Sequence, residues 1–364
     1  MPVRSAGKVL KSNHLFFQDP GCFSTHGPEP RHRDRGRRVS LGDPNRSETK
    51  GHALTARPDR VPDAESFCGY VTLLGAPNVG KSTLLNAFVG QDLSIVTSKE
   101  QTTWHRITGI RTTARHQAIF LDTPGILSPR SLIHRSLLFS AEEAVREADV
   151  ALVMSDPLRQ PSDAERGQIK GVLALGSGTR IGVVNKVDAS DPHRVEREQA
   201  WLAGLPVQSV HTVSARDGIG LEALIEDLER NLPAGPFLYP EDEVAAAPVR
   251  FFVSEMVREA IFDQFKEEVP YASICRVEDF RDSGDLTYIQ VTIYVERPSQ
   301  KQILVGGGGR AIRSLGTTAR KRIEHFLGRP VYLDLWVKVL ANWRRKPEQL
   351  RRLGLPVPRD DREH

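Results

Sequence analysis

A glycine-bearing loop between a strand-like and a helix-like segment is the feature that most constrains this chain. Residues 75–82 follow the apolar segment 70–74 and precede the helix-like segment 83–88. Glycines let backbone N–H groups turn inward, and the helix start adds positive potential, so such a loop can enclose phosphates. Lys81 would then reach the β- and γ-phosphates and Ser82 would bind Mg²⁺. The alternative is an ordinary glycine turn that opens a helix. The predicted phosphate-contacting residues are Gly75, Ala76, Pro77, Asn78, Val79, Gly80, Lys81, Ser82 and Thr83.

The region 67–233 alternates strand-like and helix-like segments. The predicted strands are 70–74, 107–111, 117–121, 150–154, 181–184 and 207–213. The predicted helices are 82–89, 133–147, 164–175, 195–203 and 221–232. Apolar strands separated by amphipathic helices predict an α/β domain whose mostly parallel sheet is covered on both faces. Ligands of such sheets bind at the carboxyl ends of the strands.

A second motif, Asp122-Thr123-Pro124-Gly125, follows the predicted strand 117–121. Alone it could be a simple Pro-Gly turn. At a strand end, Asp122 can hold Mg²⁺ through water, and the Gly125 N–H can reach a γ-phosphate. The next residue is Ile126, whose apolar side chain cannot orient an attacking water. We therefore include residues 122–126 in the nucleotide site and expect slow intrinsic hydrolysis.

A third motif, Asn185-Lys186-Val187-Asp188, follows the predicted strand 181–184. Asp188 can accept hydrogen bonds from N1–H and N2–H₂ of guanine. Adenine lacks both donors and would leave a buried carboxylate unpaired, which disfavours it strongly. The backbone of Ser214 and Ala215, at the next strand end, would contact the guanine carbonyl oxygen. The motif therefore predicts GTP and GDP as ligands.

The polar segment 94–106 lies where a nucleotide-sensing loop would order around the γ-phosphate and Mg²⁺. Thr103 is the predicted metal-binding threonine, and Thr102 is the alternative. The predicted metal site therefore comprises Ser82, Thr103 and Asp122. The residues predicted to act in GTP hydrolysis are Lys81, Thr103, Asp122 and Gly125.

The C-terminal part reads as a separate domain, 249–364, after a Pro-, Ala- and acid-rich linker, 234–248. Its predicted elements are a helix over 250–264, strands over 272–280 and 287–297, a helix over 310–326 and a strand over 331–340. Four glycines precede the last helix. A G-x-x-G loop between helices can clamp the backbone of single-stranded RNA, whereas a flexible turn is the alternative. The predicted RNA-binding residues are Gly306, Gly307, Gly308, Gly309, Arg310 and Arg313.

Composition bounds the remaining possibilities. The chain has 364 residues, enough for two domains, and a net charge of +4, which permits nucleic-acid binding without requiring it. Its three cysteines form no zinc-binding pattern, which favours free thiols in a reducing compartment. No apolar run is long enough to span a membrane, and no secretory signal is evident. Residues 1–66 read as a disordered extension, with a transit peptide or a mis-assigned start as alternatives.

From Tyr70 to Gly354 the chain resembles the Era GTPases. The motifs that carry this are GAPNVGKSTLLNAFVGQ, QTTWHR, FLDTPG, VVNKVD, VSARDG, FFVSEMVRE, VPY, ILVGGGGRAIRSLGTTARKRI and LDLWVKV…W…LRRLG. The resemblance implies a GTPase domain followed by a type II KH domain. It also implies a role in small-ribosomal-subunit assembly, in which single-stranded 16S-type rRNA binds near its 3′ end.

The resemblance has further implications and some departures. Trp104 stands where the family usually has arginine, and both middle positions of the G-x-x-G loop are glycine. Asn78 resembles the residue that coordinates K⁺ in related GTPases, so K⁺ is a candidate cofactor beside Mg²⁺. The alternative is that Asn78 hydrogen-bonds the sensing loop. We expect a cytoplasmic monomer, with an organelle matrix as the alternative compartment and peripheral membrane contact left open.

Two other functions compete with this interpretation. One is a GTPase that modifies tRNA or acts at membranes, but no cysteine-bearing modification tail and no long basic amphipathic helix is evident. The other is a non-catalytic, GTP-gated RNA-binding module. The intact Lys81, Ser82, Asp122 and Asp188 oppose loss of the nucleotide site.

Overall fold

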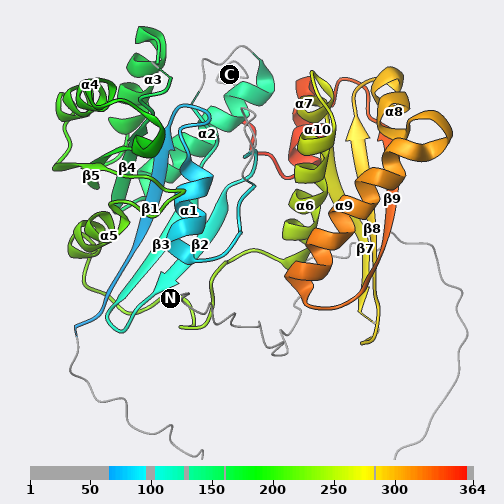
Figure 1. The fold of residues 1–364 in the computed structure, drawn as a ribbon, viewed down its shortest axis with the longest axis horizontal. Coiled ribbons are helices and arrows are strands. Elements are labelled where there is room, and N and C mark those ends of the chain that lie inside the picture. Colours follow the sequence, from blue (N-terminus) through cyan, green and yellow to red (C-terminus); the bar gives the residue numbers. More distant parts are fainter. Residues whose placement is uncertain (1–64, 96–102, 127–130, 160, 283, 359–364) are drawn as a thin grey trace, which may run out of the picture. The chain divides into compact units, whose positions relative to one another are not determined.

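The computed structural model describes residues 65–95, 103–126, 131–159, 161–282 and 284–358. The predicted extension 1–66 lies almost entirely outside them, as does Thr102. The described chain contains a six-stranded sheet followed by a three-stranded sheet (Figure 1). Among the described residues, no helix is both long and apolar enough to cross a membrane.

The six-stranded sheet has the strand order β2-β3-β1-β4-β5-β6. Its strands are β1 (Phe67–Gly75), β2 (Ile107–Thr112), β3 (His116–Asp122), β4 (Val150–Ser155), β5 (Thr179–Val184) and β6 (Ser209–Thr212). Strand β2 pairs antiparallel with β3, and the other pairs are parallel. The prediction of a mostly parallel sheet is confirmed. The last strand is shorter than predicted, since β6 begins at Ser209.

Helices cover both faces of this sheet, as its apolar central strands require. They are α1 (Lys81–Val89), α2 (Leu132–Glu147), α3 (Asp163–Leu173), α4 (Pro192–Ala203) and α5 (Leu221–Arg230), with a short 3₁₀ turn η1 (Val187–Ala189) after β5. Apolar residues of α1 and α5 join one core cluster, and those of α2, α3 and α4 join another. Every residue of β4 is buried between the two clusters.

Local sequence explains where several of these helices begin. Ser162 caps α3 in a reciprocal arrangement with Glu165, in which each side chain bonds the backbone N–H of the other. The side chain of Asp191 accepts from the Arg194 N–H, and Pro192 fills the first position of α4. Helix α1 has no side-chain cap and begins after Gly80 in a left-handed conformation. That uncapped start leaves its first N–H groups available to a ligand.

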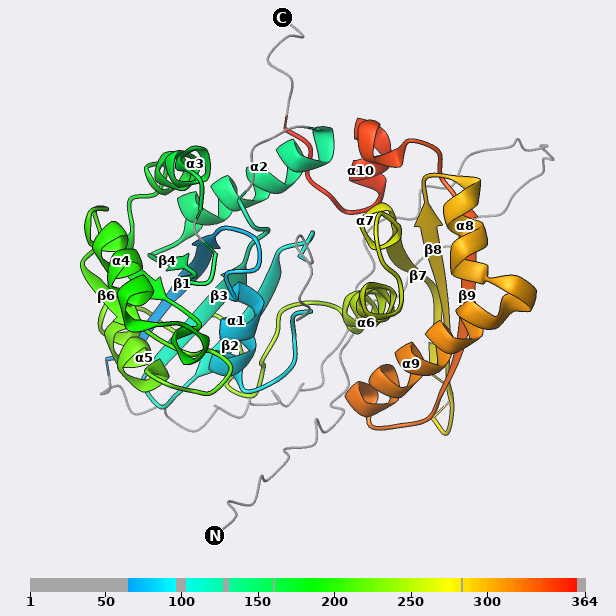
Figure 2. The same cartoon turned by 45° about the horizontal axis from the view of Figure 1, so that its top comes forward.

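The second sheet has the order β7-β8-β9, with β7 antiparallel and β9 parallel to the central β8. Its elements are α6 (Val249–Gln264), α7 (Val269–Ala272), β7 (Ile274–Asp282), β8 (Thr287–Val295), α8 (Pro298–Val305), η2 (Gly307–Gly309), α9 (Arg310–Leu327), β9 (Val331–Val339), η3 (Trp343–Arg345) and α10 (Pro347–Arg352). Figure 2 shows α6 and α9 on the same face of this sheet, and their apolar residues form its core. The predicted order of helix, two strands, glycine loop, helix and strand is confirmed, and α8 lies between the second strand and the glycine loop.

The segment 234–248 is hydrogen-bonded to the first sheet along much of its length. The Ile110 N–H donates to the Val244 carbonyl oxygen over 2.9 Å, and the Ala246 N–H donates to the Thr108 oxygen over 3.2 Å. Nearer the start of the segment, the Gln117 side chain donates to the Tyr239 carbonyl oxygen and accepts from the Tyr239 N–H. This connecting segment is therefore attached to β2 and β3.

Candidate functional site

The loop between β1 and α1 is held in a strained, open curve. Asn78 has φ 62° and Gly80 has φ 97°, both in the left-handed region. The Lys81 ammonium donates to the carbonyl oxygens of Gly75 and Ala76 over 3.3 and 3.0 Å, so the side chain folds back across the loop. Burial lowers the pKa of Lys81 to about 8. An anion beside a lysine desolvated in this way strongly stabilises its charged form, so the loop favours binding of a phosphate group.

Hydroxyl groups from three segments gather around Asp122 at the end of β3. The Ser82 hydroxyl donates to Asp122 Oδ2 over 2.8 Å and lies 3.1 Å from the Thr103 hydroxyl. Ser94 donates to the same Oδ2 over 2.7 Å. Burial raises the pKa of Asp122, and the hydroxyl hydrogen bonds and the Lys81 charge oppose that rise. The three predicted metal ligands therefore lie together.

This cluster fits a magnesium ion. Asp122 is fully buried, and its Oδ1 has no hydrogen-bond partner among the described residues. A buried carboxylate oxygen without a donor is costly unless a cation or water faces it. Mg²⁺ prefers oxygen ligands and commonly takes one carboxylate together with hydroxyls and substrate phosphates.

The Asp-Thr-Pro-Gly turn lies directly against the phosphate loop. The Thr123 hydroxyl donates to the Leu73 carbonyl oxygen over 2.6 Å, and the Ile126 N–H donates to the Gly75 oxygen over 3.1 Å. A Cβ at Gly125 would lie 2.7 Å from Pro77 Cα, so only glycine allows this approach. The Ile126 side chain is buried in the apolar cluster that also contains Leu74. It therefore contributes no polar group to the site.

The third motif links the phosphate loop to the turn at residues 214–215. The Asn185 side chain donates to the Val79 carbonyl oxygen over 2.9 Å, and its Oδ1 accepts from the Ala215 N–H over 3.0 Å. The Lys186 ammonium donates to the Asn78 carbonyl oxygen and pairs with Asp156 over 2.6 Å. The three predicted motifs and the turn at residues 214–215 thus converge at the carboxyl edge of the sheet.

Asp188 occupies the outer end of this arrangement, and its side chain is only 9% exposed. Its Oδ2 accepts from Arg216 Nη2 over 2.6 Å, whereas the Arg216 side chain is 72% exposed and also pairs with Asp217. Ser214 is buried, and its hydroxyl accepts from the Asp217 N–H over 3.1 Å. Asp188 therefore places a largely buried carboxylate at this end of the site, with Oδ2 already accepting from an exposed arginine.

Sequence reasoning missed three residues that build the site. Ser94 bonds Asp122, Asn86 holds the backbone of Ser94, and Asp156 pairs with Lys186. Asn86 follows the phosphate loop by one helical turn, and it is the one polar residue in the apolar stretch 84–89, which was the available signal. Ser94 and Asp156 carry no comparable signal, because their roles depend on contacts between distant segments.

The glycine loop between α8 and α9 presents Gly307 and Gly308 to solvent, whereas Gly306 and Gly309 are half-buried. Gly306, Gly308 and Gly309 have φ values of 68°, 62° and 75°. A Cβ at Gly306 would lie 2.7 Å from that of Ala311, whereas one at Gly308 would meet nothing within 4 Å. Arg310 Nε donates to the Gly307 carbonyl oxygen over 3.2 Å, and Arg313 donates to the oxygens of Gly308 and Gly309. Two guanidinium groups therefore lie beside a backbone that a phosphate can approach closely.

Comparison with known families agrees with this two-part organisation. Residues 70–186 match the sequence model of a family described as a 50S ribosome-binding GTPase, and residues 256–344 match a KH domain. A GTPase Era from Bradyrhizobium sp. (strain BTAi1) is 40% identical over 314 residues, covering 84% of this chain and 100% of the relative. A GTPase Era from Geobacter metallireducens is 38% identical over 289 residues, covering 79% and 97%.

Solved structures agree with the sequence relatives. The crystal structure of a single-residue variant of Aquifex aeolicus Era bound to GDP·AlF₄⁻ matches with a TM-score of 0.75 and 34% identity, covering 79% of this chain and 99% of that one. A structure of Era in complex with MgGDPNP and nucleotides 1506–1542 of 16S ribosomal RNA matches with a TM-score of 0.75 and 33% identity over the same shares. This chain therefore belongs to the GTPase Era family and is a GTPase that carries a KH domain.

Proposed function

We propose that this GTPase is an assembly factor of the small ribosomal subunit that binds single-stranded 16S-type rRNA near its 3′ end. The observation that carries the proposal is the open glycine loop of the KH domain, flanked by Arg310 and Arg313, in a chain that also holds a complete set of GTPase motifs. The Era structure that contains nucleotides 1506–1542 of 16S rRNA supports this choice of RNA.

In the proposed nucleotide site, residues 75–83 enclose the phosphates and Lys81 places its charge beside the β- and γ-phosphates. The Gly125 N–H faces the γ-phosphate from the other side. Residues 122–126, 185–188 and 214–215 complete the site, with Asp188 reading the guanine edge. These residues act mainly by holding GTP in position and stabilising charge that develops on the transferred phosphoryl group.

We assign the magnesium site to Ser82, Thr103 and Asp122, with Asp122 acting through a water. When bound, Mg²⁺ neutralises charge on the β- and γ-phosphate oxygens. Ser82 and Thr103 lie 3.1 Å apart, so their hydroxyls can serve one ion together.

We propose that intrinsic hydrolysis is slow and depends on K⁺. The buried Ile126 offers no group to orient the attacking water, so another element must do so. Asn78, which resembles the K⁺-coordinating residue of related GTPases, is the candidate residue for K⁺ binding. Its backbone is left-handed, and its carbonyl oxygen accepts a hydrogen bond from Lys186. Hydrolysis that ran equally fast in Na⁺ and K⁺ would exclude a K⁺ role.

The proposed working unit is a monomer in the cytoplasm, with an organelle matrix as the second compartment. Its GTPase domain covers 67–233, its connecting segment 234–248 and its KH domain 249–364. One apolar cluster made only of residues before 234 and another made only of residues after 248 support these boundaries.

The test measures RNA affinity and GTP hydrolysis of the purified protein with a short single-stranded RNA from the 16S 3′ end, in K⁺ buffer. In the variant Gly307→Asp/Gly308→Asp, two carboxylates repel the RNA backbone. A Cβ at Gly307 would meet only Arg310 Nη2 at 3.5 Å, and aspartate tolerates the left-handed backbone of Gly308 better than most residues, so the fold should persist. We expect RNA binding and any RNA-stimulated hydrolysis to be lost.

A matched control adds the same charge elsewhere. Gly167 and Gly171 are exposed on α3 and would accept a Cβ without contact, so Gly167→Asp/Gly171→Asp should keep RNA binding. Equal RNA affinity in both double variants would place the RNA surface outside the glycine loop. Preference for a 23S fragment over the 16S fragment would instead favour the large subunit.

A further inference from the structure

We propose that Trp104 is a positioning residue through which the KH domain holds Thr103 at the magnesium side of the nucleotide site. The inference rests on the GTPase activity of the family and on the metal role proposed for Thr103. Trp104 immediately follows Thr103, and it is only 1% exposed. It belongs to an apolar cluster whose other members include Ile133 and Leu137 of α2 and Ile274, Trp343 and Leu350 of the C-terminal part.

Two residues beyond residue 248 enclose the Trp104 indole. The Arg258 guanidinium lies over the ring at 4.3 Å from its centroid, and the Trp343 ring lies 5.6 Å away at a tilt of 49°. Arg258 is fully buried and pairs with Glu255 over 3.1 Å. A desolvated arginine over a tryptophan face is a favourable contact, so the indole is held in a fixed position.

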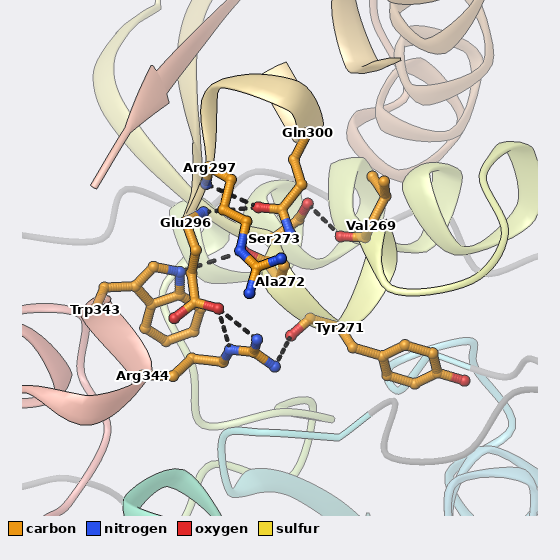
Figure 3. Close-up of polar contacts among 9 residues, drawn as sticks. All are labelled: Val269, Tyr271, Ala272, Ser273, Glu296, Arg297, Gln300, Trp343 and Arg344. Carbon is orange, nitrogen blue, oxygen red and sulfur yellow. Dashed lines mark hydrogen bonds and ion pairs between the residues drawn. The ribbon is translucent and has the colours of Figure 1, made fainter. Parts of the chain in front are cut away.

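Trp343 is itself held in place by polar contacts within the KH domain (Figure 3). Its indole Nε1 donates to the Ala272 carbonyl oxygen over 3.2 Å. The adjacent Arg344 donates to Glu296 over 2.8 Å and to the Tyr271 carbonyl oxygen over 3.2 Å. Because α7 and η3 are tied together in this way, Trp343 presents a fixed surface to Trp104.

His105, the next residue of the segment 94–106, is also held by contacts with the C-terminal part. His105 Nε2 lies 3.1 Å from the Leu353 carbonyl oxygen, and its ring meets Phe251 edge-on at 5.7 Å. Consecutive Cα atoms lie only about 3.8 Å apart, so fixing residues 104 and 105 restricts where Thr103 can lie. Thr103, in turn, lies 3.1 Å from Ser82. The contacts around Trp104 and the position of Thr103 at the magnesium site are therefore coupled, and coupling of this kind acts in both directions.

The test compares release of a fluorescent GTP analogue and of fluorescent GDP from the full-length protein, with Mg²⁺ and with EDTA. In Trp104→Ala we expect the analogue to leave about five-fold faster in Mg²⁺. Release of GDP, and release of either nucleotide in EDTA, should not change. A merely structural loss would accelerate all four rates.

Three further variants keep the test decisive. The indole Nε1 has no hydrogen-bond partner among the described residues, so Trp104→Phe should restore release close to wild type. Arg258→Met keeps the buried stem but removes the charge over the ring, and should show the same selective effect in a weaker form. Trp201→Ala removes a comparable arginine–tryptophan stack between α3 and α4, where Arg166 lies 4.7 Å from the ring centroid, and should change nothing.

Thr103→Ala distinguishes failure of the inference from failure of the metal assignment. If Thr103→Ala accelerates release of the analogue but Trp104→Ala and Arg258→Met do not, the positioning role is wrong. If Thr103→Ala itself has no effect, the metal role proposed for Thr103 is wrong, and the inference fails with it.

Discussion

Ser94 donates a hydrogen bond from its hydroxyl to Oδ2 of Asp122 over 2.7 Å, and both residues are buried. The Asn86 side chain fixes the backbone of Ser94 by accepting from its N–H over 2.9 Å and donating to its carbonyl oxygen over 2.9 Å. Helix α1 therefore controls the orientation of the Asp122 carboxylate through Ser94, and Oδ1 accepts no hydrogen bond from the described residues.

Removal of the Ser94 hydroxyl should weaken magnesium binding without removing a metal ligand. In Ser94→Ala, Asp122 loses a donor that orients it, and outer partners of metal ligands typically contribute ten-fold or more to metal affinity. We expect the Mg²⁺ concentration for half-maximal hydrolysis to rise by about ten-fold. Nucleotide affinity in EDTA should stay constant, and a fall there would show that Ser94 acts on the loop instead.

Asp188→Asn tests the base-reading assignment. The amide cannot accept from both N1–H and N2–H₂ of guanine, so GTP affinity should fall by about ten- to a hundred-fold. Xanthine presents an acceptor that the new amide N–H₂ can satisfy, so XTP affinity should rise. Competition binding with GTP, XTP and ATP measures both changes, and unchanged GTP affinity would contradict the assignment.

In the proposed nucleotide site, Arg216 would compete with guanine for the Asp188 carboxylate. Its Nη2 already donates to Oδ2 over 2.6 Å, so a bound base must share or displace it. In Arg216→Ala we expect GDP to bind about two- to five-fold more tightly at low salt, and the gain should shrink at high salt because exposed pairs are screened. Arg194→Ala, which breaks the exposed pair with Asp191, is the control. Weaker GDP binding in Arg216→Ala would mean that Arg216 holds the base.

The nucleotide motifs were predictable because each combines a fixed local spacing with a strand end. Gly75 to Ser82 needs glycines for its turns, and parallel strands bring Asp122 and Asp188 to the same edge without any knowledge of tertiary contacts. The same holds for the elements of the second sheet, whose strand alternation and glycine loop are local signals. Helix α10 was not predicted, because its six residues carry too little periodicity.

The rest of the site could not be predicted because it depends on contacts between distant segments. Ser94 reads as an ordinary loop serine until β3 places Asp122 beside it. Trp104 reads as an isolated loop aromatic until Arg258 and Trp343 enclose it. The connecting segment 234–248 was predicted from its composition as a linker, but hydrogen bonds from Gln117 and Ile110 attach it to the sheet.

Asp227 ties α5 to β6 and should make stability depend on acid pH. Its carboxylate accepts from Ser209 and from His211 Nε2 over 2.8 Å, and from Arg230 over 3.3 Å. Burial acts to raise the pKa of Asp227, but these hydrogen bonds and the nearby histidine outweigh it and lower the pKa below its usual value. A carboxyl whose folded pKa is depressed stabilises the fold above its unfolded pKa of about 3.9, and that contribution disappears as pH falls through the folded pKa.

Asp227→Asn should therefore lower the free energy of unfolding by about 1–3 kcal/mol at pH 7, since the amide cannot accept all of these bonds. The difference from wild type should shrink below about pH 4, where the wild-type carboxyl is itself protonated. Urea unfolding between pH 3 and pH 7, monitored by circular dichroism, measures both values. Glu226→Gln, at the exposed neighbouring position on α5, should follow wild type throughout. A deficit in Asp227→Asn that stayed constant down to pH 3 would show that its origin is loss of packing, because only the ionised carboxylate can produce a pH-dependent difference.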